Sequence, residues 1–405
     1  MINNEALRCL LCKKPKCSLQ GCPVHTPVPE AMALYREGKM EEAGKLLFDN
    51  NPLSAITSRV CDWHQFCYGK CVLNVKQAPI RWYEIEQEIS GKYLLDKHPL
   101  ERTSGELRNK HITLIGAGPV GLSAAVWLYR AGALVTLVDS APRMGGVLRY
   151  GIPTFRLERK WVDALESILI NAGIMFVPDT KVHDLRPWSR KADAVLIGTG
   201  AEKPATLHIP GEDNPMVIQA LPFLKDPESF TLGKKVIVIG GGNVAMDACR
   251  TAARSGSDTW VYYRKTFANM PANPLEVEEA KHDGVQFSMF QAPVEIKEGG
   301  VVFRDCENVI GEDGKIVTRI IDGTDHFVEC DNLILAISEK PDFSILEGSG
   351  AVFNQHGWPQ AGEDFKIEGL SNVYIAGDFA LGPRTVVDAV ATARTVVEAL
   401  KNTLK

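Results

Sequence analysis

The chain has 405 residues, of which 45% are hydrophobic and 23% are charged, and its formal net charge is -5. This length predicts two or three domains, each able to bury a core of its own. Acidic and basic residues are interspersed, which excludes nucleic acid as the main partner, since duplex binding needs a basic excess or stripe. No apolar run approaches the length that spans a bilayer, and the first residues lack the pattern of a signal peptide, so we expect the cytosol as the location.

Seven of the ten cysteines lie within the first 71 residues. In a chain that is not exported the thiols stay reduced, so clustered cysteines indicate metal ligands rather than disulfides. Short spacings and a proline after the fourth cysteine are typical of 4Fe–4S ligation. The alternative is structural zinc, for which His25 and His64 offer additional ligands. The spacing is Cys9-x2-Cys12-x4-Cys17-x4-Cys22-Pro23, then Cys61-x5-Cys67-x3-Cys71.

The first 105 residues are predicted to form a helical domain that carries these cysteines. Amphipathic stretches at residues 30–37 and 40–49 predict short helices, and the polar stretch at residues 96–110 reads as a linker. Beyond it, the order of buried strand, glycine turn, helix and strand occurs twice, at residues 111–140 and 235–265. Both copies have the pattern of mononucleotide-binding βαβ units in parallel sheets, so we expect two Rossmann-like α/β domains after the helical one.

The first of these units carries a glycine fingerprint for a dinucleotide, Gly116-Ala117-Gly118-Pro119-Val120-Gly121. Gly116 permits a tight turn, Gly118 lets the backbone approach a pyrophosphate, and Gly121 lets the following helix pack close to the sheet. The N-terminus of that helix offers free N–H groups to phosphates. The next strand ends at Asp139, where an acid is expected to bind ribose hydroxyls, although a solvated residue at a strand end is the alternative.

The second unit reads Gly240-Gly241-Gly242-Asn243-Val244-Ala245, in which alanine in the third glycine position is a permitted variant. We expect NAD(P)H to bind at Gly240, Gly242, Asn243 and Ala245. The next strand ends in Arg264-Lys265, where the first unit has its acid. Positive charge at this place can pair with a 2′-phosphate, which favours NADP(H) over NAD(H). The alternative is that both residues are solvated loop charges.

The C-terminal part supports a flavin. A buried strand ends in Gly377-Asp378, and Thr385-Val386 opens an amphipathic helix that runs to residue 400. Asp378 can hold the ribityl chain of a flavin while the helix N-terminus faces its ring, although Gly-Asp taken alone is as often a simple turn. We therefore expect a nicotinamide domain inserted into a flavin domain. The expected boundaries are 106–228 for the first part of the FAD domain, 229–340 for the NAD(P)H domain and 341–405 for the second part of the FAD domain.

Further stretches match a known family: residues 145–153, Gly198-Thr199-Gly200, Ile209-Pro210-Gly211-Glu212 and Met270-Pro271-Ala272. With these stretches, the cysteine region and Gly377-Asp378, the chain resembles the glutamate synthase small-subunit family over essentially its whole length. Relatives of that family are the N-terminal part of dihydropyrimidine dehydrogenase and the large subunit of the NADH-dependent ferredoxin:NADP oxidoreductase. The resemblance implies further FAD contacts at Gly146 and Gly200.

The resemblance also implies how the metal ligands are divided. Relatives complete the second cluster with a glutamate or glutamine that follows a proline-hydrophobic segment. The matching residue here is Glu86, with Gln87 next to it, and a solvated helix glutamate is the alternative. The implied sets are Cys9, Cys12, Cys17 and Cys71 for cluster one, and Cys22, Cys61, Cys67 and Glu86 for cluster two.

The chain departs from the pattern of this family at a few positions. The gap between Cys17 and Cys22 is one residue longer than usual, and Asp62 stands where a proline is expected. Ser58 and Ser338 replace glycines. These changes affect loop geometry and cluster potential more than the presence of a cluster.

These features predict an electron-transfer subunit that exchanges electrons between NAD(P)H, FAD and two 4Fe–4S clusters. Hydride transfer between nicotinamide and flavin is chemistry of the cofactors themselves, so no catalytic acid, base or nucleophile is predicted. Glu276 is a candidate only for nucleotide contact. No stretch remains for an amidotransferase, a pyrimidine-reducing barrel or a hydrogenase domain. We therefore expect the substrate site on a partner subunit of glutamate synthase, dihydropyrimidine dehydrogenase, ferredoxin reductase or hydrogenase type.

Three other functions remain possible from the residues. One is a stand-alone NAD(P)H-dependent flavoprotein reductase, and another is a non-catalytic sensor or interaction subunit that keeps its cofactors. A dithiol–disulfide reductase shares the two-nucleotide architecture, but it needs a close cysteine pair near the flavin. Cys249, Cys306 and Cys330 are each isolated in the sequence, which disfavours that function.

Overall fold

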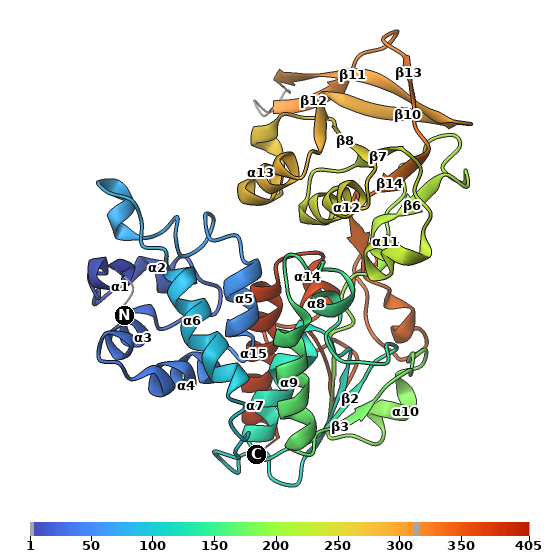
Figure 1. Cartoon of the computed structure of the whole chain (residues 1–405). Coiled ribbons are helices and arrows are strands. Elements are labelled where there is room, and N and C mark those ends of the chain that lie inside the picture. Colours follow the sequence, from blue (N-terminus) through green and yellow to red (C-terminus); the bar gives the residue numbers. More distant parts are fainter. Residues whose placement is uncertain (1–3, 311–315, 405) are drawn as a thin grey trace. The chain divides into compact units, whose positions relative to one another are not determined.

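The computed structural model describes residues 4–310 and 316–404 (Figure 1). The chain divides into two compact units. The first holds the described residues up to Arg149, Thr154–Glu202 and the described residues from Pro341 onward, and the second holds Tyr150–Pro153 and Lys203–Lys340. Apart from the short segment Tyr150–Pro153, the chain thus leaves the first unit after Glu202 and returns to it at Pro341. No helix within the described ranges is long and apolar enough to cross a membrane.

The N-terminal part of the first unit consists of short helices around one core, to which Met32, Leu47 and Ile85 contribute. The predicted helices at residues 30–37 and 40–49 are confirmed, and residues 96–110 contain neither helix nor strand, as expected for a linker. Proline is favoured in the first turn of the third helix, Val28–Arg36, because the proline ring fixes φ at a helical value. The elements are α1 (Asn4–Arg8), α2 (Lys16–Leu19), α3 (Val28–Arg36), α4 (Met40–Asn50), α5 (Ser54–Val60), the 3-10 helix η1 (Val72–Val75) and α6 (Trp82–Leu95).

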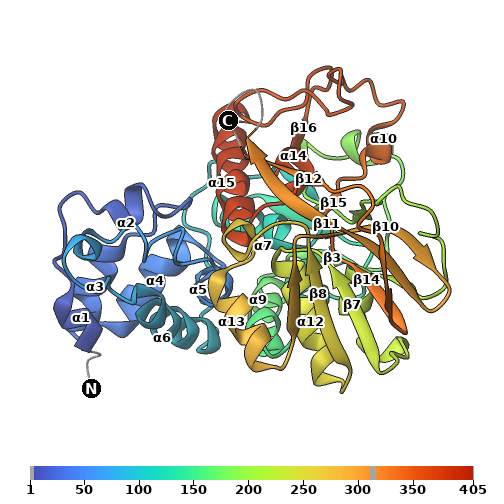
Figure 2. The same ribbon diagram turned by 90° about the horizontal axis from the view of Figure 1, so that it is seen from above.

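The rest of the first unit is built on a five-stranded parallel sheet in the order β16-β4-β1-β2-β3. Its inner strands are mostly apolar and buried, because helices cover both faces of a parallel sheet. Helix α15 lies against α7 (Figure 2). The strands are β1 (His111–Ile115), β2 (Leu134–Val138), β3 (Met175–Val177), β4 (Ala194–Ile197) and β16 (Val373–Ile375). The helices are α7 (Pro119–Arg130), α8 (Val147–Tyr150), α9 (Arg159–Asn171), α10 (Arg186–Ser189), the 3-10 helix η4 (Phe343–Leu346), α14 (Asp378–Leu381) and α15 (Val386–Thr403).

Within this unit, polar contacts to backbone carbonyls and to one carboxylate fasten the helical part to α7 and α15. The Trp127 indole donates to the Asp49 carbonyl at 3.1 Å, and the Arg130 guanidinium pairs with the Asp49 carboxylate. From α15, Arg394 donates to the carbonyl of Val24 at 3.0 Å. The two helices that pack on the sheet therefore also hold the cysteine-bearing part.

The second unit contains another parallel sheet, in the order β6-β14-β7-β8-β9, and an antiparallel sheet of β10 to β13. Because β6 pairs with β14, residues 203–228 lie with this unit, whereas the sequence analysis placed them in the first flavin segment. Strand β5 pairs with β15 where the chain enters and leaves the unit. The elements are β5 (Lys203–Pro204), β6 (Val217–Gln219), α11 (Ala220–Lys225), η2 (Pro227–Ser229), β7 (Lys235–Ile239), α12 (Asn243–Arg254), β8 (Asp258–Tyr263), η3 (Phe267–Asn269), α13 (Pro274–His282), β9 (Gln286–Met289), β10 (Gln291–Lys297), β11 (Gly300–Ile310), β12 (Ile316–Ile320), β13 (His326–Glu329), β14 (Asn332–Leu335) and β15 (Glu339–Lys340).

Candidate cofactor sites

The glycine loop of the first unit is crowded by backbone on several sides. Gly116 has a φ of 105°, and a Cβ there would lie 2.5 Å from the carbonyl oxygen of Gly198. A Cβ on Gly146, whose φ is 51°, would lie 2.7 Å from the Cα of Gly118. At Gly121 the added atom would be 2.0 Å from the Gly116 carbonyl oxygen. Three stretches singled out from the sequence thus meet at one place, and only glycine fits these positions.

Asp139 follows β2 and is tied to this loop. Its carboxylate accepts hydrogen bonds from the amide of Ala117 at 2.6 Å and from the amide of Ala141 at 2.8 Å. A carboxylate offers about four lone-pair positions, so two remain for ribose hydroxyls. The structure therefore gives Asp139 a structural role beside the predicted one, because its carboxylate joins the strand end to the glycine loop.

The C-terminal segment forms a second wall of the expected flavin site. Gly377 has a φ of 63°, and its amide donates to the Thr392 hydroxyl at 2.9 Å. Thr385 is the N-cap of α15, which begins at Val386, and forms a reciprocal capping box with Asp388. Gly200, with a φ of 74°, has open space where a side chain would be. Burial raises the pKa of the Asp378 carboxyl to about 6, although the Arg384 amide, which donates to it, lowers the pKa in part.

This raised pKa predicts that Asp378→Asn stabilises the flavin-free protein near neutral pH. Between pH 3.8 and about 6 the folded state binds the proton more tightly than the unfolded state, so the contribution of Asp378 to stability is present at low pH and lost as pH rises. Asparagine stays neutral, so its advantage at pH 8 should be about 1–3 kcal/mol, from 1.36 kcal/mol per pKa unit and partial exposure. Urea unfolding of both apoproteins at pH 4 and pH 8 measures it; an equal difference at both pH values contradicts the prediction.

In the second unit, the glycine loop is held by its neighbours in the same way. A Cβ on Gly240, whose φ is 149°, would lie 2.2 Å from the Ala336 carbonyl oxygen. Gly242 is the N-cap of α12, and Ala245 in the third glycine position is fully buried. The Asn243 side chain accepts from the amide of Asn273 at 2.9 Å. The amide of Ala272 also donates to Gly241 at 3.0 Å, so the Met270-Pro271-Ala272 stretch packs against the nucleotide loop.

Arg264 and Lys265 follow the last residue of β8, with Arg264 exposed and Lys265 half-buried. Neither forms an ion pair with a residue in the described part of the chain. Glu276, the candidate for nucleotide contact, instead pairs with the buried Arg250 of α12 at 2.8 Å. Its carboxylate therefore joins α12 to α13, and Arg264 and Lys265 remain the charged candidates at the strand end.

The four side chains of the first implied ligand set line one cavity, together with Cys67. The pKa of Cys17 is raised to about 11, mostly by burial and in part by the neighbouring thiolate charges of Cys71, Cys9 and Cys12. Thiols this close repel one another once ionised, so a cation is needed to hold them deprotonated. A bound iron–sulfur cluster would supply that charge.

The second implied set is more deeply buried. Burial raises the pKa of Cys61 well above its usual value, and the charges of Cys22, Glu86 and Cys67 raise it further. Burial likewise raises the pKa of Glu86 to about 7, although Ser54, whose hydroxyl donates to Glu86 at 2.9 Å, lowers it. Glu86, on the buried face of α6, thus lies near the cysteines of this set.

Gln87 points elsewhere. Its side-chain amide donates to the Ser58 carbonyl at 2.8 Å. The structure therefore brings Glu86, rather than its neighbour, into the second set. Ser54 was not singled out from the sequence, and nothing but its position seven residues before Cys61 pointed to it.

The first donor set fits a polynuclear cluster, because its four thiols line one cavity. In a 4Fe–4S cluster each thiolate binds a different iron, so the ligands surround a volume rather than a point. Zinc instead draws four ligands to about 2.0–2.3 Å from one atom. Among the residues described here, no three His, Cys, Asp or Glu side chains are placed to hold a single metal ion. His25 bonds to the Ser18 carbonyl at 3.2 Å, and His64 packs on Tyr68.

The remaining cysteines do not form a redox pair. Cys249, Cys306 and Cys330 are buried free thiols. Burial raises the pKa of Cys330 to about 12 and the pKa of Cys249 above its usual range. Such thiols are inert, whereas a dithiol–disulfide reductase needs a reactive pair.

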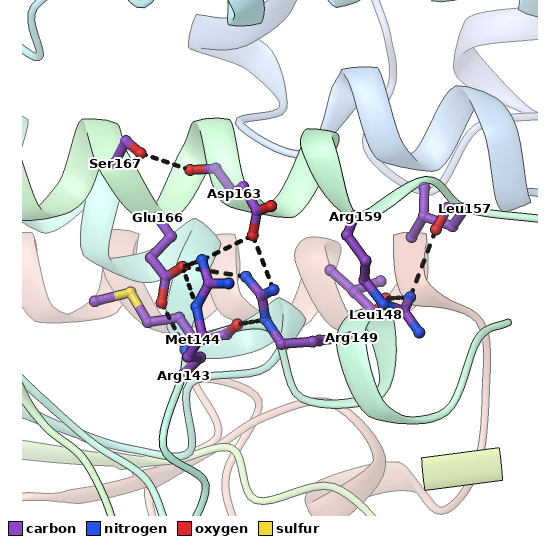
Figure 3. Close-up of polar contacts among 9 residues, drawn as sticks. All are labelled: Arg143, Met144, Leu148, Arg149, Leu157, Arg159, Asp163, Glu166 and Ser167. Carbon is purple, nitrogen blue, oxygen red and sulfur yellow. Dashed lines mark hydrogen bonds and ion pairs between the residues drawn. The ribbon is translucent and has the colours of Figure 1, made fainter. Parts of the chain in front are cut away.

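A buried ion-pair cluster holds the loop that carries Gly145 and Gly146 (Figure 3). Glu166 of α9 accepts from the amide of Met144 at 3.0 Å, and Arg149 donates to the carbonyl of Met144 at 2.6 Å. Arg149 and Glu166 also pair with each other at 3.1 Å. The two charged side chains therefore form a clamp that holds both the backbone amide and the backbone carbonyl of Met144. Asp163 pairs with Arg149 and with Arg143, each at 2.8 Å.

This clamp was not predicted from the sequence. A signal was present, because Glu166 lies on the apolar face of an amphipathic helix, four residues after Val162 and three before Leu169, both fully buried. A charged residue in such a position needs a buried partner.

Comparisons with known proteins agree with this architecture. Residues 1–97 match the family described as dihydropyrimidine dehydrogenase domain II, 4Fe-4S cluster, and residues 188–393 match pyridine nucleotide-disulphide oxidoreductase. The glutamate synthase [NADPH] small chain of Escherichia coli (strain K12) is 30% identical over 430 residues, covering 99% of this chain and 91% of that relative. The putative oxidoreductase AegA of the same organism is 31% identical over 425 residues, covering 98% of this chain and 64% of that relative.

Solved structures share the fold of most of the chain. Mycobacterium tuberculosis FprA in complex with NADPH has a TM-score of 0.61 at 19% identity, over 73% of this chain and 85% of that one. Thioredoxin reductase of T. acidophilum has a TM-score of 0.55 at 20% identity, over 73% of this chain and 99% of that one.

The fold and the matched families define an NAD(P)H-dependent oxidoreductase with a flavin and a 4Fe–4S domain. Within that class the chain belongs to the glutamate synthase small-chain family. The resemblance inferred from the motifs and the predicted enzyme class are thereby confirmed.

Proposed function

We propose that this chain is an electron-transfer subunit that exchanges electrons between NADP(H), FAD and two 4Fe–4S clusters, and between these and a partner subunit. The flavin site is assigned to residues 106–228 and 341–405 and the nicotinamide site to residues 229–340, except that residues 203–228 fold with the latter. Nicotinamide and flavin supply hydride chemistry when bound. The chain's own residues bind and orient the two groups. The observation that carries the proposal is the gathering of seven free thiols in the helical part, which α7 and α15 hold against the expected flavin fold.

The second set lies next to the expected flavin site. Burial raises the pKa of Cys61 most, and among the charges that raise it further is that of Asp388 in the first turn of α15. Asp388 forms the capping box with Thr385, a predicted flavin contact. Cys67 of the second set is in turn influenced by the charge of Cys17 in the first. These links support the order FAD, second cluster, first cluster.

The relatives support a partner. The similar protein of Escherichia coli is named as the small chain of an NADPH-dependent glutamate synthase, which implies a large chain beside it. In AegA and YgfK the matching region makes up 64% and 37% of a longer chain. A module that occurs both as a small chain and within longer oxidoreductases is suited to deliver electrons to another domain.

Anaerobically purified protein should contain one FAD and about eight irons per chain, as two 4Fe–4S clusters require. NADPH should bleach the flavin and cluster absorbance faster than NADH does. In a variant with Arg264→Ala and Lys265→Ala that preference should disappear, because a 2′-phosphate loses its cationic partners. Zinc in place of iron, or a protein that NAD(P)H does not reduce, would overturn the proposal. An active flavoprotein with no iron would instead identify a stand-alone reductase.

A further inference from the structure

The segments that carry the first ligand set are purely basic in a chain of net charge -5. Neither residues 6–29 nor residues 63–83 contain an Asp or Glu. All the lysines in these two segments are exposed. The basic residues are Arg8, Lys13, Lys14, Lys16, Lys70, Lys76 and Arg81. The two arginines pair with Glu5 and Glu84 at the borders of the segments, so the five lysines carry the charge of this surface.

Exposed apolar side chains lie in the same two segments. Leu7, Leu10 and Leu19 are 63%, 62% and 54% exposed, and Val75 is 83% exposed. Leu10 lines the cavity of the first ligand set itself. Apolar groups surrounded by exposed charges are the usual anatomy of a protein interface.

The two segments form one surface. Residues of both, among them Lys16 and Leu73, line the same cavity. A Cβ placed on Gly21 would lie 2.9 Å from the Cβ of Lys70. The guanidinium of Arg8 donates to the carbonyl of Ala78 at 2.5 Å. Charged and apolar groups therefore gather around the cavity that the first ligand set lines.

We propose that this surface, the basic face formed by residues 6–29 and 63–83, is the docking site of a partner protein that presents an acidic face and carries its own redox centre. The inference rests on the proposed function and specifies its partner. A single electron passes between the first cluster and the partner's centre. The donor is oxidised by one electron and the acceptor is reduced by one electron, with no proton transferred and no bond broken. A nucleic acid would also attract the lysines, but it would leave Leu7, Leu10 and Val75 without apolar contacts.

The test uses holoprotein reduced with dithionite and freed of excess reductant, mixed in a stopped-flow instrument with oxidised rubredoxin, a small acidic iron protein. A variant with Lys13→Glu, Lys14→Glu and Lys70→Glu should react at least about tenfold more slowly than wild type at low ionic strength, because long-range attraction raises association rates about 10–1000-fold. The difference should vanish at about 0.5 M salt, where charges are screened within a few ångströms. With cytochrome c, a basic acceptor, the same variant should react faster.

The matched control reverses three exposed lysines of the same domain that lie outside the basic face, Lys39, Lys45 and Lys92. The control should keep the rate with rubredoxin, and an equal loss in both variants would overturn the proposal, as would a triple variant as fast as wild type. Tighter binding of duplex DNA than of rubredoxin would assign the face to nucleic acid instead. Zinc-substituted, labelled rubredoxin reports docking by fluorescence anisotropy without electron transfer. Charge-dependent docking by a protein that transfers no electrons would overturn the proposed function and keep the docking surface.

Discussion

Replacing Cys67 by serine is expected to stop the flow of electrons beyond the flavin while leaving reduction of the flavin by NADPH intact. The pKa of Cys67 is raised mainly by burial and further by the charges of Glu86, Cys22 and Cys17, and its side chain lines the cavity of the first set. The proposal assigns this thiol to the second set. Loss of the outer hydrogen-bond partners of metal ligands costs about 10–100-fold in affinity or activity, so loss of a ligand should lower electron transfer to rubredoxin more than a hundredfold. Ferricyanide, which takes electrons directly from flavins, should still be reduced.

Cys71→Ser is the matched variant for the first ligand set. It removes a ligand of the first set only, so it should lose about four of the eight irons, as Cys67→Ser does. The two variants should nevertheless differ. After NADPH is added, Cys71→Ser should show the electron paramagnetic resonance signal of one reduced cluster, and Cys67→Ser should show none from NADPH. Identical spectra, or normal transfer to rubredoxin in either variant, would contradict the order of cofactors.

Local chemistry explains which parts of the fold could be predicted. The strand at residues 111–115 and the helix cap at Thr385 appear where expected, because both depend on neighbours in sequence. The glycine positions were equally readable, since a Cβ at Gly116 or Gly240 collides with a backbone carbonyl. Because only glycine meets these steric limits, they can be read directly from the sequence.

Contacts between distant segments could not be read in the same way. Strand β16 pairs with β4, although 175 residues separate Ile197 from Val373 along the chain, and β6 pairs with β14 to draw residues 203–228 into the second unit. Asp139 lies at the end of a strand, as predicted, but the hydrogen bond that its carboxylate accepts from the amide of Ala117 was not predicted. The division of the cysteines came from resemblance, because spacing alone allows several groupings. Pairing over long distances depends on the packed molecule, which no local pattern encodes.

The clamp around Met144 gives the second large expected effect, in the variant Glu166→Gln. The amide oxygen of glutamine can still accept from the Met144 amide, but the buried Arg149 loses its charged partner. Arg149 and Glu166 are only 7% and 6% exposed, and breaking a buried pair typically costs about 3–5 kcal/mol. Asp163 still faces Arg149, so we expect the lower end of this range in the free energy of unfolding.

The same variant should bind FAD more weakly, because the clamp fixes the loop whose Gly146 packs against Gly118. If half of the lost free energy of unfolding reflects weaker positioning of that loop, the dissociation constant of FAD rises about tenfold, since 1.4 kcal/mol corresponds to a factor of ten. Titration of the apoprotein with FAD, followed by quenching of flavin fluorescence, measures this change. Asp163→Asn is the control, because its side chain is 40% exposed and exposed pairs contribute about 0–1 kcal/mol. Unchanged FAD affinity in Glu166→Gln, or an equal loss in both variants, would show that the cluster stabilises α9 without positioning the flavin loop.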